Sequence, residues 1–382
     1  SSMSVGRYHL GKSYASIARC RFYHELSFSV NGDPLEVLNY IQSNLLDNKH
    51  PPSKNHVGIE MLYAPFNPAD WNAIEGKYPM PNDRTTHQSQ LSPVSVVAGS
   101  EGIGRIRLAN GTRFQEGDII TTGISGIGTM RSFLWVPESS LQLLTRGEEL
   151  IECVGGAAAS TLSQHGGTAL RMLVDFTKDG AVIQNAGNSG VGMMVSQLAN
   201  EMLRPTISMV RRGSKSENEW NDLVDFMTCK GKCQIVVAEE DLMEKETMLA
   251  FQDRLKVENI VPTLALNAVG GKSASLLAKL VGTSGTVVTY GGMSKEPIIT
   301  NTPHFIFKDI RYVGYWHSRW MTEHGYDQKQ EMLDYLVTQV LDGKVSCPPI
   351  IEFNLKDFQK ALTMQSLQQG VRKKICFGCQ ET

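Results

Sequence analysis

NAGNSGVG, at residues 185–192, is the stretch of sequence that decides the fold of this chain. It follows the apolar run GAVIQNA (180–186) and leads into a helical pattern over residues 190–203. Small residues at such a turn let the backbone approach a pyrophosphate, and the free N–H groups of the helix N-terminus stabilise its charge. The spacing departs from the GxGxxG pattern, because asparagine or serine takes the position of the central glycine. On its own the turn has two interpretations, a dinucleotide site and a plain structural turn.

The sequence after this turn alternates short apolar runs with helical stretches. Further strands are predicted at TISMV (206–210), QIVV (234–237), TLALNAV (263–269), GTVVTYGG (285–292) and DIRYVGYW (309–316). Helices are predicted between them near 216–228, 242–255 and 273–281. Such an alternation predicts an α/β domain of the Rossmann type, with a doubly wound parallel sheet and right-handed crossovers. Between the first strand and the first helix of such a domain, the glycine-rich turn is best interpreted as a dinucleotide site.

The chain on both sides of this domain is rich in predicted strands. They are HVGIEMLYAPF (56–66), PVSVVAGSEGIGRIRLA (93–109), GDIITTG (117–123) and the terminal KKICF, with helices predicted near 326–342 and 355–367. We expect residues 25–155 and 325–382 to form one discontinuous β-rich catalytic domain around a dinucleotide-binding domain at 156–324. The cleft between the two domains is then the expected site.

Composition limits the class of protein further. The 382 residues are 41% hydrophobic and 20% charged with a net charge of −2, which argues against broad binding to nucleic acid or to an acidic membrane. Seven cysteines, an odd number in a long chain, favour a reducing compartment over a disulfide framework. Residues 1–24 form a basic arm without an acidic residue. This arm resembles an organelle transit peptide or its remnant, with a chance basic segment as the alternative.

The end of the second predicted strand indicates which dinucleotide binds. Enzymes that use NAD place a carboxylate there for the ribose 2′-hydroxyl. Here the strand runs instead into Arg211, Arg212 and Gly213, followed by Lys215. Because a guanidinium binds a 2′-phosphate in a bidentate, charge-assisted way, the cofactor predicted is NADPH. A solvated basic turn is the alternative interpretation.

Two later strand ends carry glycine and aromatic residues. Tyr290-Gly291-Gly292-Met293 and Gly314-Tyr315-Trp316 both lie at the carboxyl ends of predicted strands, where ligands bind in open α/β sheets. Their glycines would let the backbone reach a nicotinamide ring, and the aromatic side chains would line its pocket. Core packing is the other interpretation of the aromatic residues.

The sequence argues against a zinc mechanism. Ser100 stands where zinc alcohol dehydrogenases have a histidine ligand, and no cysteine lies between Cys20 and Cys153. A tetrahedral zinc site needs three or four such ligands, so we predict no metal. Tyr78 is then the candidate for stabilising charge or donating a proton, although a loop tyrosine beside a proline is often structural.

Several motifs together resemble one enzyme family. NAVGGKSA (267–274), VTYGGMSKEP (288–297), FIFKDIRYVGYW (305–316), NPADWNAIEGKYP (67–79) and NAGNSGVG resemble the mitochondrial trans-2-enoyl-thioester (enoyl-acyl carrier protein) reductases. These are zinc-free medium-chain dehydrogenases/reductases, and the resemblance spans roughly residues 55–377. It implies a GroES-like catalytic domain, a homodimer in the mitochondrial matrix, and NADPH-dependent reduction of enoyl thioesters carried by acyl carrier protein or CoA in fatty-acid synthesis. Hydride would go to the β-carbon, while the thioester oxygen takes up charge and a proton reaches the α-carbon.

The resemblance also implies roles for individual residues. It implies that Tyr78 is the catalytic tyrosine and that Lys373 contacts the cofactor, with Lys374 as the alternative register. The other cofactor contacts that it implies are Asn188, Ser189, Gly190 and Val191 for the pyrophosphate, Arg211, Arg212 and Gly213 for the 2′-phosphate, and Tyr290, Gly291, Gly292, Met293, Tyr315, Trp316, His317 and Ser318 on the nicotinamide side.

The sequence departs from the family pattern at two positions that bear on function. His165 takes the place of a cofactor-contacting asparagine, and Met130 replaces a tryptophan that would line the acyl site. Two alternatives to an enoyl-thioester reductase stay open at this stage. One is an NADPH:quinone reductase of the same fold, and the other is a cofactor-binding regulator that has lost turnover.

Overall fold

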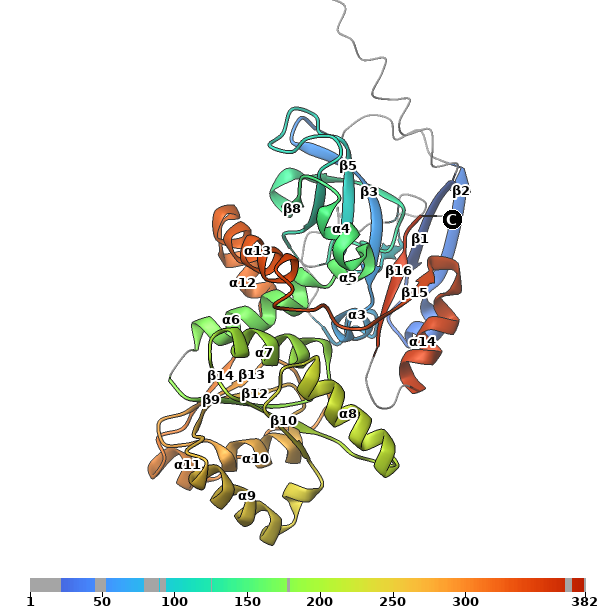
Figure 1. Ribbon diagram of the computed structural model, residues 1–382. Helices are drawn as coiled ribbons and strands as arrows, with labels where there is room; N and C mark the ends of the chain where they lie inside the picture. The colour runs from blue at the N-terminus through green and yellow to red at the C-terminus, as the bar shows by residue number, and fades with distance from the viewer. Residues whose placement is uncertain are drawn as a thin grey trace, which may run out of the picture.

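The structure is a computed structural model that describes residues 22–44, 53–78, 89, 94–124, 126–176, 179–367 and 373–380. It has the predicted fold class, a parallel sheet flanked by helices joined to a β-rich lobe. Figure 1 shows the two lobes one above the other, with the β-rich lobe at the top. No helix in the described part of the chain is long and apolar enough to cross a membrane.

The parallel sheet forms the centre of the lower lobe. Its strands are β9 (Ala181–Asn185), β10 (Thr206–Val210), β11 (Ile235–Ala238), β12 (Pro262–Asn267), β13 (Thr286–Thr289) and β14 (Arg311–Gly314). They lie in the order β11-β10-β9-β12-β13-β14, and every neighbouring pair is parallel. This is the Rossmann order, in which the chain reverses direction across the sheet beside the first strand, β9. The predicted doubly wound sheet is therefore confirmed.

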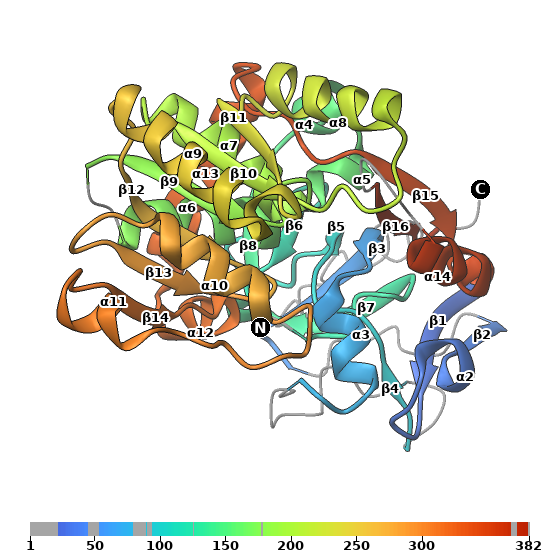
Figure 2. The same ribbon diagram turned by 90° about the horizontal axis from the view of Figure 1, so that it is seen from below.

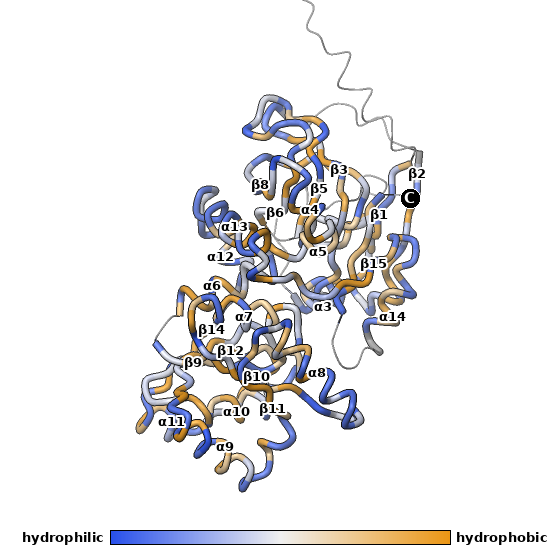
Figure 3. The backbone as a smooth tube through the Cα atoms, in the orientation of Figure 1, coloured by the Kyte–Doolittle hydropathy of each residue, from blue (hydrophilic) through white to orange (hydrophobic). Residues whose placement is uncertain are grey.

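Helices cover both faces of this sheet because successive strand side chains point to opposite sides. On one face, Ile183 lies in a hydrophobic cluster with the helix residues Phe251 and Leu277. On the other face, its neighbour Val182 lies in a cluster with the helix residue Val195. The helices of this lobe are α6 (Gly167–Asp175), α7 (Gly190–Glu201), α8 (Glu217–Cys229), α9 (Lys245–Val257), α10 (Gly271–Leu280) and α11 (Thr302–Ile306). Figure 3 shows the same division, with hydrophobic strands inside and more hydrophilic helices such as α8 and α9 outside.

Strands from both outer parts of the chain share one sheet in the upper lobe. Its members are β3 (His56–Pro65), β5 (Ile103–Leu108), β6 (Ile119–Thr122), β7 (Phe133–Pro137), β8 (Leu141–Thr145), β15 (Ile350–Asn354) and β16 (Lys374–Gly378). The early and late strands join where β16 pairs antiparallel with β3, with Cys376 opposite Pro65. Strand pairing does not fix the residue at which either domain ends, so the predicted boundaries stay predictions.

A smaller sheet lies beside the larger one. It consists of β1 (Phe22–Phe28), β2 (Asn39–Asn44) and β4 (Val96–Val97), in the order β2-β1-β4. Strand β1 begins within the segment that we predicted as a basic arm, and residues 1–21 of that arm lie outside the described residues.

The remaining helices connect the strands and the two lobes. They are α2 (Pro34–Val37), α3 (Pro68–Ile74), η1 (Glu138–Ser140), α4 (Glu149–Val154), α5 (Gly156–Ala159), the π-helix η2 (Leu162–Gly166), η3 (Asp241–Met243), α12 (His317–Glu323), α13 (Tyr326–Leu341), η4 (Leu355–Asp357) and α14 (Phe358–Leu367). Figures 1 and 2 agree that α3 lies where the two lobes meet. Because a π-helical turn is rare and often found at functional sites, η2 is a second candidate element of the site.

Candidate active site

The glycine-rich turn joins β9 to α7 at the carboxyl edge of the parallel sheet. Ser189 is the N-cap of α7, and its hydroxyl accepts a hydrogen bond of 3.1 Å from the backbone N–H of Gly192. A Cβ atom at Gly192 would lie 2.6 Å from the carbonyl oxygen of Ala186, so only glycine allows this close turn. The helix N-terminus is thereby presented at the place where a dinucleotide-binding fold holds a pyrophosphate.

His165 lies against this turn from the π-helix η2. A Cβ atom at Gly190 would lie 3.0 Å from its Nε2 atom, and the imidazole is 7% exposed. Within the described part of the chain its Nδ1 atom has no hydrogen-bond partner. Burial, reinforced by nearby Lys374, lowers the pKa of His165 to about 3. The histidine is therefore neutral at pH 7, and it brings an unpaired polar atom to the position that we predicted for a cofactor contact.

Tyr290 and the two glycines after it lie at the end of β13. The backbone N–H of Tyr290 donates to Asn267 at 3.0 Å, and its hydroxyl is buried with Ser189 as a neighbouring polar group. That hydroxyl forms no well-directed hydrogen bond within the described residues, and burial raises its pKa. A Cβ atom at Gly291 would lie 2.8 Å from the carbonyl oxygen of Ala268, whereas Met293 is 44% exposed. This segment thus faces the glycine-rich turn through Tyr290.

Tyr78 reaches the same region from the upper lobe. Its backbone N–H donates to the carbonyl oxygen of Asn72 at 3.1 Å, which fixes it to the end of α3. Its hydroxyl accepts a hydrogen bond from the indole Nε1 of Trp316 and lies 3.5 Å from the hydroxyl of Ser318. The two aromatic rings meet edge to face, with centroids 6.0 Å apart. The predicted catalytic tyrosine and two predicted nicotinamide-side residues are therefore in contact.

Residues 315–318 divide between the junction with Tyr78 and the core. The hydroxyl of Tyr315 and Nδ1 of His317 form a hydrogen bond of 2.8 Å, and both side chains are buried. A Cβ atom at Gly167 would lie 2.7 Å from the His317 ring, and burial lowers the pKa of His317 to about 4. Tyr315 and His317 thus pack beneath the site, while Trp316 and Ser318 are the residues that meet Tyr78.

The basic turn after β10 is more evenly balanced in charge than its sequence suggested. Arg212 forms an ion pair with Glu217 and lies over the ring of Trp220, 5.8 Å from its centroid. Glu240 accepts hydrogen bonds from the backbone N–H groups of Arg212 and Gly213 at 2.9 and 3.0 Å. Arg211 is exposed and interacts electrostatically with Glu239. Of the two arginines, Arg211 is therefore the one whose side chain is available to a phosphate.

The two candidate lysines differ in environment. Lys373 is exposed just before β16, whereas the ammonium group of Lys374 is enclosed near Asp70 and Glu101. Burial lowers the pKa of Lys374 to about 8, against the opposing effect of these two carboxylates. Lys374 is also the lysine whose charge acts on His165. The structure therefore brings Lys374, the alternative register, closer to the glycine-rich turn than our first choice, Lys373.

Three acidic or amide residues near the site did not enter the predicted set. Asn67, Asp70 and Glu101 form a buried polar cluster at the start of α3. A signal existed for two of them, since Asn67-Pro68-Ala69-Asp70 is a helix-start pattern and α3 does begin at Pro68. For Glu101 the only sequence signal was its position next to the serine that replaces a zinc ligand.

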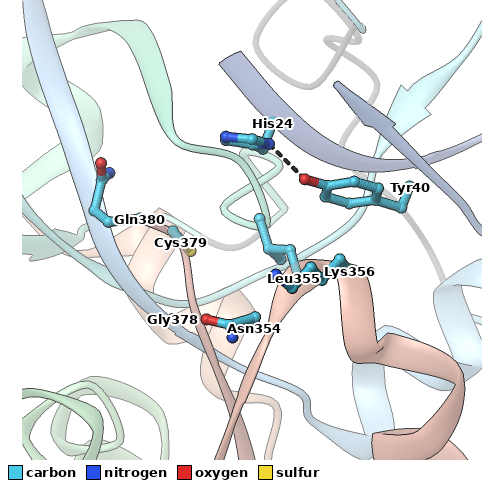
Figure 4. A pocket seen from close by; sticks show the side chains of 8 residues that line it. All are labelled: His24, Tyr40, Asn354, Leu355, Lys356, Gly378, Cys379 and Gln380. Carbon is cyan, nitrogen blue, oxygen red and sulfur yellow. Dashed lines mark hydrogen bonds between the residues drawn. The ribbon is translucent and has the colours of Figure 1, made fainter. Parts of the chain in front are cut away.

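The candidate site is marked neither by a metal-binding cluster among the described residues nor by the cavity in the upper lobe. Among the described residues no group of three or more His, Cys, Asp and Glu side chains could hold a metal ion. A cavity of about 220 Å³ opens instead in the upper lobe, between β1, β2 and the strands β15 and β16 (Figure 4). In it Nδ1 of His24 and the hydroxyl of Tyr40 share a hydrogen bond of 2.6 Å. None of the predicted site residues lines that cavity.

The Rossmann sheet, the β-rich lobe and the residues that meet between them define a medium-chain dehydrogenase/reductase. No family model matches the sequence. The mouse (Mus musculus) protein described as "Enoyl-[acyl-carrier-protein] reductase, mitochondrial" is 33% identical over 356 residues, which cover 92% of this chain and 87% of that protein. The chain therefore belongs to the family of the mitochondrial enoyl-acyl carrier protein reductases, and the resemblance inferred from the motifs is confirmed.

Solved structures show the same fold. The Etr1p/NADP/crotonyl-CoA complex has a TM-score of 0.81 and 23% sequence identity, covering 94% of this chain and 99% of that one. The Etr1p/Etr2p heterodimer from Candida tropicalis has a TM-score of 0.80 and 24% identity, with coverage of 94% and 99%. Both lobes are included in these matches, so the arrangement of the two lobes is that of a known enzyme fold.

Proposed function

We propose that this protein reduces trans-2-enoyl thioesters to saturated acyl thioesters with NADPH. One observation carries the proposal within this family: the hydroxyl of Tyr78, from the upper lobe, meets Trp316 and Ser318 of the lower lobe beside the nicotinamide-side segments. A phenol held at this junction can act on a substrate bound between the lobes. The acyl thioester would be carried by acyl carrier protein or by CoA.

The residues present fit an NADPH cofactor. The close turn at Gly192, the capped N-terminus of α7 and the unpaired buried Nδ1 of His165 form a cradle for a pyrophosphate and its neighbouring ribose. Arg211 would bind the 2′-phosphate, and the segment from Tyr290 to Met293 would face the nicotinamide. Lys374 is the favoured C-terminal contact, because its ammonium group is enclosed beside this cradle.

The chemistry requires a hydride at the β-carbon and a proton at the α-carbon. When bound, NADPH supplies the hydride. Because the oxygen of Tyr78 already accepts from Trp316, its own hydrogen can be donated to another acceptor, such as a substrate bound at this junction. We infer that it donates to the thioester oxygen, where negative charge develops, or to the α-carbon. Accepting one hydrogen bond also strengthens the donation of the other.

The setting of the reaction follows from the family. The relatives are described as mitochondrial, and Etr1p forms a heterodimer with Etr2p. We propose the mitochondrial matrix as the location of this protein, with the basic segment at residues 1–24 as the transit peptide or its remnant.

A homodimer is proposed from the edge of the parallel sheet. Strand β14 is the last strand on one side, and an unpaired edge strand is a site for pairing with another chain. Large exposed apolar side chains gather in the segment just before it, and they are Ile298, Ile299, Phe305, Ile306 and Phe307. A second copy of the chain covering this edge would remove these side chains from water.

The test is an NADPH oxidation assay with enoyl thioesters of increasing chain length. We expect turnover with crotonyl- and hexenoyl-thioesters and none with a quinone. Rapid turnover with a quinone alone would replace the proposal with a quinone reductase. Tight NADPH binding without reduction of any substrate would indicate a cofactor-binding regulator.

A further inference from the structure

We propose that Glu101 is a positioning residue that fixes the catalytic tyrosine and the cofactor turn relative to each other. This inference rests on the proposed function, since it concerns how the reacting groups are aligned. Glu101 lies just before β5 and is completely buried. Its carboxylate binds one residue on the path to Tyr78 and one on the path to the glycine-rich turn.

The first path leads to Tyr78. One carboxylate oxygen of Glu101 accepts a hydrogen bond of 3.1 Å from the side-chain amide of Asn67, which is the N-cap of α3. Helix α3 is only seven residues long, and the backbone N–H of Tyr78 is bonded to its Asn72. A shift of Asn67 would therefore move the whole short helix and the tyrosine attached to its end.

The second path leads to the cofactor turn. The other carboxylate oxygen accepts a hydrogen bond of 2.7 Å from the backbone N–H of Gln164 in the π-helix. His165 is the next residue, and it packs against Gly190 at the start of α7. The same carboxylate thus holds the π-helical turn at the position that places His165 beside the glycine-rich turn.

The electrostatic setting of Glu101 favours such a role. Asp70 and Lys374 lie near it, and Lys374 lowers the pKa of both carboxyl groups against the dominant effect of burial. Placing a carboxyl group in the interior is costly unless it is hydrogen-bonded and paired. A polar link at this cost can specify one geometry where apolar packing would allow small displacements. Small displacements matter here, because a misplacement of about 1 Å can lower a catalytic rate about 100-fold.

Three substitutions test the inference. Glu101→Leu removes both hydrogen bonds, Glu101→Gln keeps an oxygen that can accept from Gln164, and Asn67→Ala breaks only the path to Tyr78. For each protein we would measure the dissociation constant of NADPH by fluorescence titration without substrate. The rate of hydride transfer would be measured in a single turnover at saturating NADPH, with the deuterium isotope effect on transfer from labelled NADPH.

The expected results separate the two paths. Glu101→Leu should weaken NADPH binding about tenfold and slow hydride transfer at saturation at least tenfold, as expected when the Gln164 N–H and the Asn67 amide are left buried without their acceptor. Glu101→Gln should bind NADPH within about threefold of the wild type, since the acceptor for the Gln164 N–H is kept. It should slow hydride transfer as Asn67→Ala does, because its NH2 group faces the Asn67 amide, which is also a donor. Asn67→Ala should slow hydride transfer while leaving NADPH binding unchanged. If Glu101→Leu does not fold, Glu101→Gln and Asn67→Ala still test the path to Tyr78, and unchanged hydride transfer in both would overturn the inference.

Glu25→Leu is the matched control. Glu25 is also completely buried and hydrogen-bonded, to Tyr23 at 2.7 Å and Ser89 at 2.5 Å, but it lies in β1 of the smaller sheet. A thermal destabilisation shared by Glu101→Leu, Asn67→Ala and Glu25→Leu, without a specific loss of NADPH binding or hydride transfer, would overturn the inference. Absence of turnover in the wild type would instead overturn the proposed function, and the NADPH titrations would still test the path through Gln164.

Discussion

The hydroxyl of Tyr78 accepts a hydrogen bond from the indole of Trp316, a residue 238 positions further along the chain. The bond joins the end of α3 in the upper lobe to the start of α12 in the lower lobe. It orients the phenol at the junction where substrate and cofactor would meet. The clearest tests of the proposed reaction therefore act on these two residues.

Tyr78→Phe should lower turnover about 100-fold or more while leaving the affinity for NADPH nearly unchanged. Loss of a single donor to a developing negative charge costs about 10²–10³ in rate, and that interaction exists mainly in the transition state. Steady-state kinetics with a hexenoyl thioester and a fluorescence titration of NADPH measure the two quantities. Tyr335→Phe, on helix α13, is the matched control. Unchanged turnover in Tyr78→Phe would reject the catalytic role.

Trp316→Phe should have a smaller effect than Tyr78→Phe. It keeps an aromatic ring against Tyr78 but removes the indole N–H that orients the hydroxyl. A hydrogen bond of this kind contributes about 0.5–1.5 kcal/mol, so a decrease of about two- to tenfold in turnover is expected. The double variant Tyr78→Phe/Trp316→Phe should be no slower than Tyr78→Phe alone. Additive losses would show that Trp316 acts independently of the tyrosine.

Only two of the four residues at 315–318 reach the catalytic candidate Tyr78, although the sequence predicted one role for all four. The motif placed all four at the nicotinamide side, yet only Trp316 and Ser318 reach Tyr78, because Tyr315 and His317 bond to each other below the surface. Side-chain direction after a strand end depends on how the following helix packs, and here α12 packs through Trp320 and Met321. No local pattern in the sequence encodes that packing.

The parallel sheet was predictable because each strand is a short apolar run bounded by turns. The upper lobe was harder: β7, with the sequence FLWVP, and β1 were not predicted, although both have strand-forming residues. Their place depends on pairing with distant partners, such as β7 with β3 and β1 with β4. The cluster around Glu101 was missed for the same reason, since Asn67, Gln164 and Lys374 come together only in the folded chain.

Arg211→Ala should weaken NADPH about 10- to 100-fold and leave NADH binding almost unchanged. This is the loss expected for hydrogen bonds between a guanidinium and a phosphate. Arg212→Ala should cost NADPH only about threefold, because the Arg212 side chain is already held by Glu217 and Trp220. Competition titrations with NADPH and NADH measure the ratio of their two dissociation constants. An equal loss of NADPH and NADH in Arg211→Ala would refute the phosphate assignment.

Phe307→Glu should convert the proposed dimer into a monomer. Phe307 is 76% exposed in the segment before β14, and a charged group buried there without a partner opposes association. Light scattering coupled to size-exclusion chromatography measures the mass. Val257→Glu is the control, because Val257 is 88% exposed at the end of α9 and outside the segment. A monomeric wild type, or a dimer that survives in Phe307→Glu, would contradict the proposed interface.

Two buried histidines make the stability of the protein depend on pH below neutral. Burial lowers the pKa of His317 to about 4 from an ordinary value of 6.5, so between these two values the unfolded chain binds more protons than the folded one. The free energy of unfolding therefore falls as the pH falls through this window, by about 1.4 kcal/mol per pH unit for one such histidine. His165, with a pKa of about 3, acts in the same direction over a wider range.

Glu101 opposes this trend, because burial raises its pKa to about 8 and the folded chain then binds more protons than the unfolded one between about 4.5 and 8. The free energy of unfolding of the wild type therefore contains contributions of opposite sign from Glu101 and the histidines. The contribution of one histidine is measured as the difference in free energy of unfolding between its variant and the wild type. We expect the stability of His317→Asn relative to the wild type to rise by about 1.4 kcal/mol for each pH unit below 6.5. Urea unfolding at pH 5, 6 and 7 measures it, and His165→Asn should give the same slope. Parallel curves for the variants and the wild type would show that the two histidines are not held neutral in the folded chain.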